Sequence, residues 1–236
     1  RDRYFRGVAT ETDRDCTMDA SKTVSFPYPL LEDPVALARR RGWSEAVYRD
    51  LLALQRGEMS EAAFRDAYLW TRAILILDMT DFTTSAISAG DLDSLLRILD
   101  AQKVVLPVLE EHGATLAHCF ADDIFALFES PFVALDAAIE IQRRVTAFNE
   151  SELASAFPTQ CCIGIGFGEV LKIGPDLAHG SEMNMASKLG EEVARGREIL
   201  LTESSYRAVR QRTDVRFVHH AKDGKRFGFY EVDLSP

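Results

Sequence analysis

An apolar run that stops at an aspartate constrains this chain more than any other feature. Residues 73–77 read Ala-Ile-Leu-Ile-Leu and Asp78 follows directly, a run long enough for a buried strand and too short for a helix. A carboxylate at the end of a buried strand is costly unless it has a partner or a cation. Asp78 is therefore either a cap for the next turn or a metal ligand that needs a second carboxylate.

A candidate for that second carboxylate lies in a predicted hairpin. Two short apolar runs flank Ala121-Asp122-Asp123, which puts acidic residues at the hairpin tip. If this hairpin lies beside the first strand, Asp78 and Asp122 meet at one edge of the sheet. Oxygen-only ligands suit Mg²⁺ or Mn²⁺ rather than zinc. The alternative is a solvated acidic turn.

Strands and helices alternate along the rest of the sequence. Helices are predicted to begin near residues 33, 44 and 60 and to span about 91–111, 131–148, 182–194 and 203–210; further strands are predicted at about 161–170, 199–201, 215–218 and 227–232. This order indicates an α+β fold with a ferredoxin-like β-α-β-β-α-β core, extra C-terminal helices and a closing hairpin. A small helical N-terminal segment precedes it.

Two domains are predicted: an N-terminal arm and helical segment at 1–70, and the main domain at 71–236. The N-terminal helices act either as a brace on that domain or as a dimerising, signal-transmitting pair. In the helix at 91–111 we expect one apolar side to be buried. That side consists of Leu92, Leu95, Leu96, Leu99 and Val108.

Net charge and cysteine content argue against several classes of protein. The formal net charge of −10 argues against a general nucleic-acid binder and against attraction to an anionic membrane surface. The 4 cysteines have no metal-type C-x-x-C spacing and favour a reduced, cytoplasmic compartment. No transmembrane run or signal peptide is found.

In their order along the chain, the motifs resemble the catalytic domain of class III nucleotidyl cyclases. A strand ending in Asp78-Met79 and followed by Phe82-Thr83, a helix, the acidic hairpin and a second helix lead to Ile163–Val170 and Asn184–Leu189. The resemblance covers roughly residues 71–232. It implies metal-dependent conversion of a nucleoside triphosphate to a 3′,5′-cyclic nucleotide and pyrophosphate, in signal transduction.

The resemblance also implies the ligands of two Mg²⁺ or Mn²⁺ ions. Asp78, Asp122 and the carbonyl of Met79 match the metal ligands, and Phe82 and Thr83 fall among the nucleotide-binding positions. Asp123 and Asp81 replace small residues of the family pattern. Each is either a further ligand or a solvated carboxylate, and the second interpretation is favoured.

Asn184 matches the asparagine that orients the ribose, but Lys188 replaces the arginine that stabilises the transition state. Lysine keeps the charge and loses the planar fork that grips a phosphate at two points, so we expect a slow or conditional enzyme; the alternative is a surface lysine without a catalytic role. His118 occupies the position at which the family has its base-selecting lysine. It is either a purine contact or a strand-edge histidine. Leu177 occupies the position of the aspartate that acts together with this lysine in the family, and Asp176 is the preceding residue.

Neither base-selecting pair is reproduced; ATP is expected as substrate more than GTP. Lys222 and Lys225 fall where the family binds phosphate, with a solvated turn as the alternative. Gly164, Gly166 and Gly168 either relieve crowding in their strand or, by resemblance, keep space clear beside the nucleotide.

In the resembled family the metal aspartates and the Asn/Arg pair come from opposite chains. We therefore expect a homodimer, or a heterodimer whose partner supplies the missing groups. The competing hypothesis is a catalytically degenerate domain that binds nucleotide or regulates a partner. A purely structural dimerisation domain is a third. A diguanylate cyclase is disfavoured, because the hairpin lacks both glycines of that motif and Phe125 comes one residue late.

Overall fold

The computed structural model describes residues 28–40, 42–79, 90–154, 158–175, 177–221 and 227–234. Residues 32–236 form one compact unit. Its helices are α1 Pro34–Ala38, α2 Glu45–Gln55, α3 Glu61–Tyr68, α5 Asp91–Glu111, α6 Pro131–Asn149, α7 Ser181–Ser187, the π-helix η1 Lys188–Val193 and α8 Glu203–Val209. Its strands are β1 Leu69–Met79, β2 Leu116–Phe120, β3 Asp123–Phe128, β4 Cys161–Lys172, β5 Ala178–His179, β6 Ile199–Leu201, β7 Arg216–His220 and β8 Phe229–Asp233.

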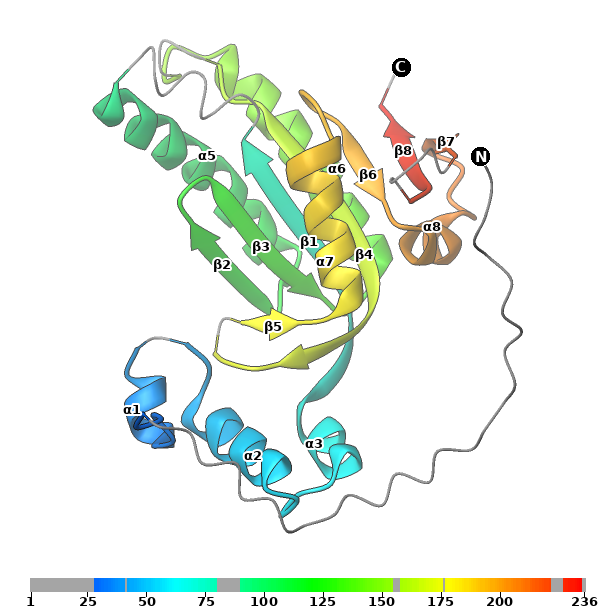
Figure 1. Cartoon of the computed structure of the whole chain (residues 1–236). Helices are drawn as coiled ribbons and strands as arrows, with labels where there is room; N and C mark the ends of the chain where they lie inside the picture. The colour runs from blue at the N-terminus through cyan, green and yellow to red at the C-terminus, as the bar shows by residue number, and fades with distance from the viewer. Residues whose placement is uncertain are drawn as a thin grey trace, which may run out of the picture. The chain divides into compact units, whose positions relative to one another are not determined.

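A single sheet with the strand order β2-β3-β1-β4-β6-β8-β7 organises the fold, and β5 pairs with β4 (Figure 1). Neighbours among β2, β3, β1 and β4 are all antiparallel, which confirms the predicted ferredoxin-like core. The parallel pairing of β6 with β4 and the β7–β8 hairpin extend the sheet. The predicted α+β class is thus confirmed.

Helices cover the central sheet on both faces. α5 and α6 pack on the face that includes Leu75, Leu77 and Phe128. The opposite face, with Ile74, Ile76 and Leu127, is covered near α7 by Ala186. Because side chains alternate along a strand, Asp78 belongs to the α7 face. In the part of the chain that the structure describes, no helix is both long and apolar enough to span a membrane.

The N-terminal helices begin at the predicted caps. The Ser44 hydroxyl accepts a hydrogen bond from Val47 N at 3.3 Å, and Ser60 does the same for Ala63 at 3.2 Å. β1 then starts at Leu69, earlier than the apolar run alone predicts. Ser44 N donates to the Ile173 carbonyl at 2.9 Å, and further on Arg65 pairs with Glu169 at 2.7 Å. These contacts favour a brace.

The predicted buried side of α5 is wrong at four of its five positions. Leu92, Leu95, Leu96 and Leu99 are 45–70% exposed and only Val108 is buried. The side turned to the protein carries Ser94, Arg97, Asp100, Ala101, Val105, Val108 and Leu109. Helical periodicity finds the apolar stripe but does not say which side faces the sheet. Towards its N-terminus, α5 therefore turns a polar side inward and its leucines outward.

The glycines of β4 make room for the next helix. A Cβ at Gly164 would overlap the Ala186 carbonyl oxygen and lie 2.6 Å from the Gly190 nitrogen. Such atoms at Gly166 and Gly168 would come within 2.8 Å and 2.7 Å of Glu182. Of the two readings left open by the sequence, the structure favours relief of crowding. The glycines seat α7 and η1 directly on β4.

Candidate functional site

The two acidic motifs meet where β1 ends beside the β2–β3 hairpin. Leu77 of β1 is paired with Ile124 of β3, so the following residue on β1, Asp78, comes beside the start of β3 at Asp123. On its other side Asp78 is paired with Cys162 of β4. The prediction that the fold brings Asp78 to the acidic hairpin is therefore confirmed.

Carboxylates crowd one another at this point. Burial raises the pKa of Asp78 to about 7, helped by the charges of Asp123, Asp122 and Glu191 and opposed by a hydrogen bond from the Met79 backbone. Burial likewise raises the pKa of Asp123 to about 6, with Glu191 and Asp122 adding to the shift. Negative charge is thus held close together in a half-buried place, at a cost that a cation would offset.

The acidic cluster, which we define as Asp78, Asp122, Asp123 and Glu191, contains two members that the sequence did not single out as ligands. Asp123 lies in β3 rather than in the turn. The charge of Asp123 raises the pKa of Asp78 more than the charge of Asp122 does. Glu191 comes from η1, where it accepts a 2.5 Å hydrogen bond from Ser187. Glu191 lies one turn beyond Lys188, but this spacing alone did not point to the acidic cluster; π-helical turns are frequent at functional sites.

Oxygen donors such as these suit a hard divalent cation, because Mg²⁺ is bound by one or two carboxylates with water and substrate oxygens. Within the described ranges, no three or more His, Cys, Asp and Glu side chains are grouped as a complete metal-binding set. Carboxylate oxygens fit Mg²⁺ or Mn²⁺ by their chemistry, but the described side chains by themselves do not form a complete set of metal ligands.

The hairpin turn at this site holds its first residue in an unfavourable conformation. Ala121 has a φ of 53°, in the left-handed region that costs a residue with a Cβ roughly 1–2 kcal/mol. Glycine is the residue that adopts this region freely. The chain tolerates the strain where the acidic turn joins β2 to β3.

Asn184 and Lys188 lie on the surface of the α7–η1 helix. Both are exposed; Asn184 is in α7 and Lys188 begins the π-helical turn. Lys188 is not among the groups that raise or lower the pKa of Asp78 or Asp123. The two predicted catalytic residues thus project from the helix with their polar groups open to solvent.

A cavity joins the two predicted base-selecting positions. His118 of β2 and Leu177, just before β5, line a space of about 470 Å³ together with Trp43 and Pro175. Ala38, Gly42 and Ser44 complete the lining. The sequence did not predict that the N-terminal segment reaches this position. Phe82, Thr83, Asp176, Lys222 and Lys225 lie outside the described residues.

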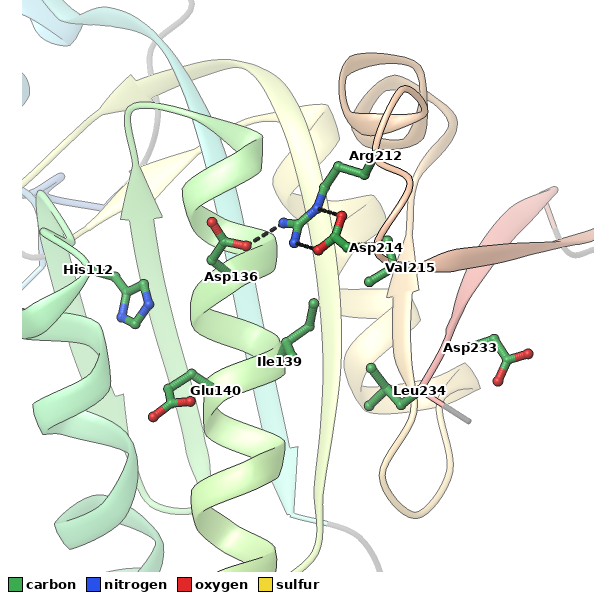
Figure 2. A pocket seen from close by; sticks show the side chains of 9 residues that line it. All are labelled: His112, Asp136, Ile139, Glu140, Arg212, Asp214, Val215, Asp233 and Leu234. Carbon is green, nitrogen blue, oxygen red and sulfur yellow. Dashed lines mark hydrogen bonds and ion pairs between the residues drawn. The ribbon is translucent and has the colours of Figure 1, made fainter. Parts of the chain in front are cut away.

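A second hollow, of about 380 Å³, opens between the end of α5, α6 and the strands at the sheet edge (Figure 2). Arg212 reaches across it to form ion pairs with Asp136 of α6 and with Asp214. None of the predicted site residues lines it. Because α6 packs on the face of the sheet opposite Asp78, this hollow is distinct from the acidic cluster.

Comparisons with known proteins identify the fold. No family model and no curated protein matches the sequence. The solved structures that match include the adenylyl cyclase CyaB from P. aeruginosa, at 14% identity over 71% of this chain and 97% of that one, with a TM-score of 0.59. A guanylate cyclase domain from Catenaria anguillulae in complex with GTP matches at 15% identity, over 69% and 96% of the chains, with a TM-score of 0.59.

An adenylate/guanylate cyclase/hydrolase from Silicibacter pomeroyi matches at 19% identity over 71% and 98% of the chains, with a TM-score of 0.58. The chain has the class III nucleotidyl cyclase fold. The predicted resemblance is thereby confirmed at the level of the fold. At these sequence identities the comparisons show the fold alone, and the activity has to be argued from the residues of this chain.

Proposed function

We propose that this chain is a class III nucleotide cyclase, which converts a nucleoside triphosphate to a 3′,5′-cyclic nucleotide and pyrophosphate. The observation that carries the proposal is the meeting of Asp78 with the acidic hairpin within a class III cyclase fold. A carboxylate whose pKa is raised to about 7 by burial and like charges is the arrangement expected of a site that awaits a cation.

Two Mg²⁺ or Mn²⁺ ions are proposed as cofactors. Asp78, Asp122 and the Met79 carbonyl would hold them, with Asp123 as a further carboxylate nearby. The ions would neutralise the triphosphate charge and lower the pKa of the attacking 3′-hydroxyl. Because ionised carboxylates bind a divalent cation and protonated ones do not, the raised pKa of Asp78 makes metal binding strengthen as the pH rises towards 7 and above.

The remaining groups would act on the nucleotide. Asn184 is proposed to orient the ribose by hydrogen bonds from its side-chain amide. Lys188 is proposed to hold phosphate charge as a single-point donor. An ammonium group lacks the two-point grip of a guanidinium, and losing one preorganised donor costs roughly 10²–10³ in rate. The proposed enzyme is therefore slow, or it depends on an activating partner.

A homodimer is proposed as the active form. Asn184 and Lys188 are exposed on the α7–η1 helix, whereas the carboxylates of Asp78 and Asp123 are partly buried at the strand ends. An exposed pair of this kind is free to face the acidic cluster of a second chain. A closed dimer with two-fold symmetry would then contain two equivalent sites.

ATP is proposed as the preferred substrate. The cavity beside His118 has no carboxylate among its described lining residues. Guanine presents an N1–H and an exocyclic amine that need acceptors, and leaving such donors unpaired in a pocket is expensive. Adenine places fewer donors on that edge. Leu177 and Pro175 therefore suit adenine better than guanine.

The test is product formation by the purified full chain with ATP and with GTP in Mn²⁺, beside the Asp78→Ala variant. We expect cyclic AMP from the parent protein, less cyclic GMP, and loss of both in the variant. Equal product from parent and variant would overturn the proposal. A parent that forms no product at any enzyme concentration would shift the proposal to the regulatory module described next.

One observation favours a second candidate, a regulatory module that binds metal-nucleotide without turning it over. Lys188 replaces a guanidinium at the one position where the transition state needs it most, and the side chain is exposed. Calorimetry distinguishes the two candidates. Tight binding of Mn²⁺-ATP with no product, in the presence or absence of a partner chain, would favour the regulatory module.

A further inference from the structure

We propose that Trp43 forms a wall of the purine-base site, so that the N-terminal segment contributes a stacking surface to nucleotide binding. The inference rests on the proposed function and deepens it, because it names which part of the nucleotide the cavity takes and which residue holds it. Trp43 stands well before β1, outside the strand and helix motifs that carry the resemblance to cyclases.

The cavity is assembled from three separate parts of the chain. Ala38, Gly42, Trp43 and Ser44 come from α1 and the link to α2; His118 comes from β2; Pro175 and Leu177 come from the link between β4 and β5. A volume of about 470 Å³ lies within the range of small-molecule sites, roughly 300–1,000 Å³, which combine apolar walls with a few placed polar groups. His118 is the polar group here.

Trp43 is held in place from two sides. Its ring stacks on that of Tyr48, with centroids 5.2 Å apart and planes inclined by 23°. Its backbone N–H donates to the Tyr48 hydroxyl at 3.3 Å. The next residue, Ser44, donates its N–H to the Ile173 carbonyl at the end of β4 at 2.9 Å. The segment that carries Trp43 is therefore attached to the sheet that carries the proposed site, and the indole is stacked on Tyr48.

Anchoring leaves much of the indole uncovered. Trp43 is 40% exposed although it lines a cavity, so a flat ligand could cover surface that the protein does not. Aromatic stacking of a base on a side chain tolerates any base, because every base has a π-face. A purine stacked on Trp43 would add a third ring to the Tyr48–Trp43 pair, while His118 meets its edge.

One lining residue of the cavity lies shortly before Asn184, the residue proposed to hold the ribose, along the chain. Leu177 directly precedes β5, and β5 leads into α7, which carries Asn184. In the proposed arrangement, a base between Trp43 and His118 directs its ribose towards this helix. Base, ribose and phosphate contacts then follow one another along Trp43, Asn184 and Lys188 on the same chain.

The experiment measures the binding of α,β-methylene-ATP, in which the bond that cyclisation breaks is replaced, to the full chain with Mn²⁺ by calorimetry. Tripolyphosphate is the second probe, because it has the phosphates and no base. We expect Trp43→Ala to weaken α,β-methylene-ATP by roughly 10-fold or more and to leave tripolyphosphate unchanged. Trp43→Phe should keep most of the affinity, because it keeps an aromatic face.

Intrinsic fluorescence gives a second readout that does not depend on Trp43→Ala folding. The chain has 2 tryptophans, so Trp70→Phe leaves Trp43 as the sole indole emitter. We expect α,β-methylene-ATP to quench the emission of Trp70→Phe and not that of Trp43→Phe. Tripolyphosphate should quench neither.

The outcomes separate this inference from the proposed function. Equal affinity of parent and Trp43→Ala for α,β-methylene-ATP, with no quenching in Trp70→Phe, would overturn the role of Trp43 and leave the cyclase proposal standing. A parent chain that binds neither α,β-methylene-ATP nor tripolyphosphate would overturn the proposed nucleotide site and this inference with it.

Discussion

The acidic cluster and the nucleoside side of the proposed site are built in opposite ways. Asp78 and Asp123 stand on paired strands and are partly buried, and burial together with the charges of nearby carboxylates raises the pKa of both. Asn184, Lys188 and Trp43 stand on a surface helix and a link between helices, and all three are exposed. One side is already arranged within the chain, and the other is open to solvent.

This difference predicts which property of the protein a substitution on each side should change. The fold itself carries the cost of holding carboxylates together, so changes to the acidic cluster should appear in the stability and pH dependence of the metal-free protein. The exposed side costs the fold little, so changes there should appear in binding and turnover. The close packing of α7 against the glycines of β4 links the two sides, because α7 carries Asn184 and β4 pairs with the strand of Asp78.

Gly164→Ala should therefore have the largest effect on stability. Its Cβ would overlap the Ala186 carbonyl oxygen, a backbone atom that cannot move without shifting α7. We expect a loss of about 3 kcal/mol in the free energy of unfolding, as for overpacked cores, measured by urea denaturation. Gly174→Ala is the control, because its Cβ would meet only ordinary contacts from 3.4 Å. Equal stability of the two variants would contradict the close packing of α7 against Gly164.

The pH dependence of the metal-free chain sharpens the comparison next. Asp78 has an ordinary pKa of 3.8 and a folded-state pKa of about 7. Below pH 3.8 the carboxyl is protonated in both states. As the pH rises towards 7 the unfolded chain ionises first, so stability falls, and above 7 the loss is complete. One pKa unit corresponds to about 1.4 kcal/mol, and solvent screens a half-buried carboxyl group, so we expect a loss of about 2–4 kcal/mol.

Asp78→Asn should abolish most of this loss. The variant should be more stable than the parent at pH 8 and nearly equal to it at pH 4, as measured by urea denaturation without metal. Mn²⁺ should stabilise the parent at pH 8 and not the variant, because a ligand that binds only the folded state stabilises it. Parallel stability curves for parent and variant from pH 4 to pH 8 would contradict a charge-strained cluster.

Lys188→Arg tests the exposed side. Restoring a planar, five-donor guanidinium should raise the turnover number by roughly 10-fold, less than the 10²–10³ of a whole preorganised donor because lysine already supplies the charge. The free energy of unfolding should stay unchanged, because Lys188 is exposed. Lys172→Arg, a change at a cation that lies over the Trp70 ring, is the matched control. A rise in turnover in both variants, or in neither, would remove Lys188 from the proposed role.

Ala121→Gly should have the smallest effect. Its φ of 53° suits glycine, so the change should stabilise the chain by roughly 1 kcal/mol. Ala117→Gly, at an exposed position in β2, should instead destabilise it, because glycine weakens a strand interior. Thermal unfolding of the two variants should shift in opposite directions. A lower midpoint for Ala121→Gly would mean that the turn is not strained as described.

Local signals in the sequence predicted most of the fold. The serine caps of α2 and α3, the hairpin around Asp122 and the buried strand before Asp78 depend on neighbours along the chain. The side that α5 turns inward could not be predicted, because the period of a helix gives a stripe and not its partner. Glu191 and Trp43 were missed for a related reason, since only the packed chain brings them to the site.

The most direct test of the account mixes two inactive variants. Asp78→Ala spoils the acidic cluster and keeps the nucleoside side, and Asn184→Ala does the reverse. If one chain's acidic cluster works with the other chain's Asn184, the mixture recovers cyclic nucleotide formation to roughly a quarter of the parent, because half of the dimers each hold one intact site. A mixture as inactive as its components, beside an active parent, would contradict the account.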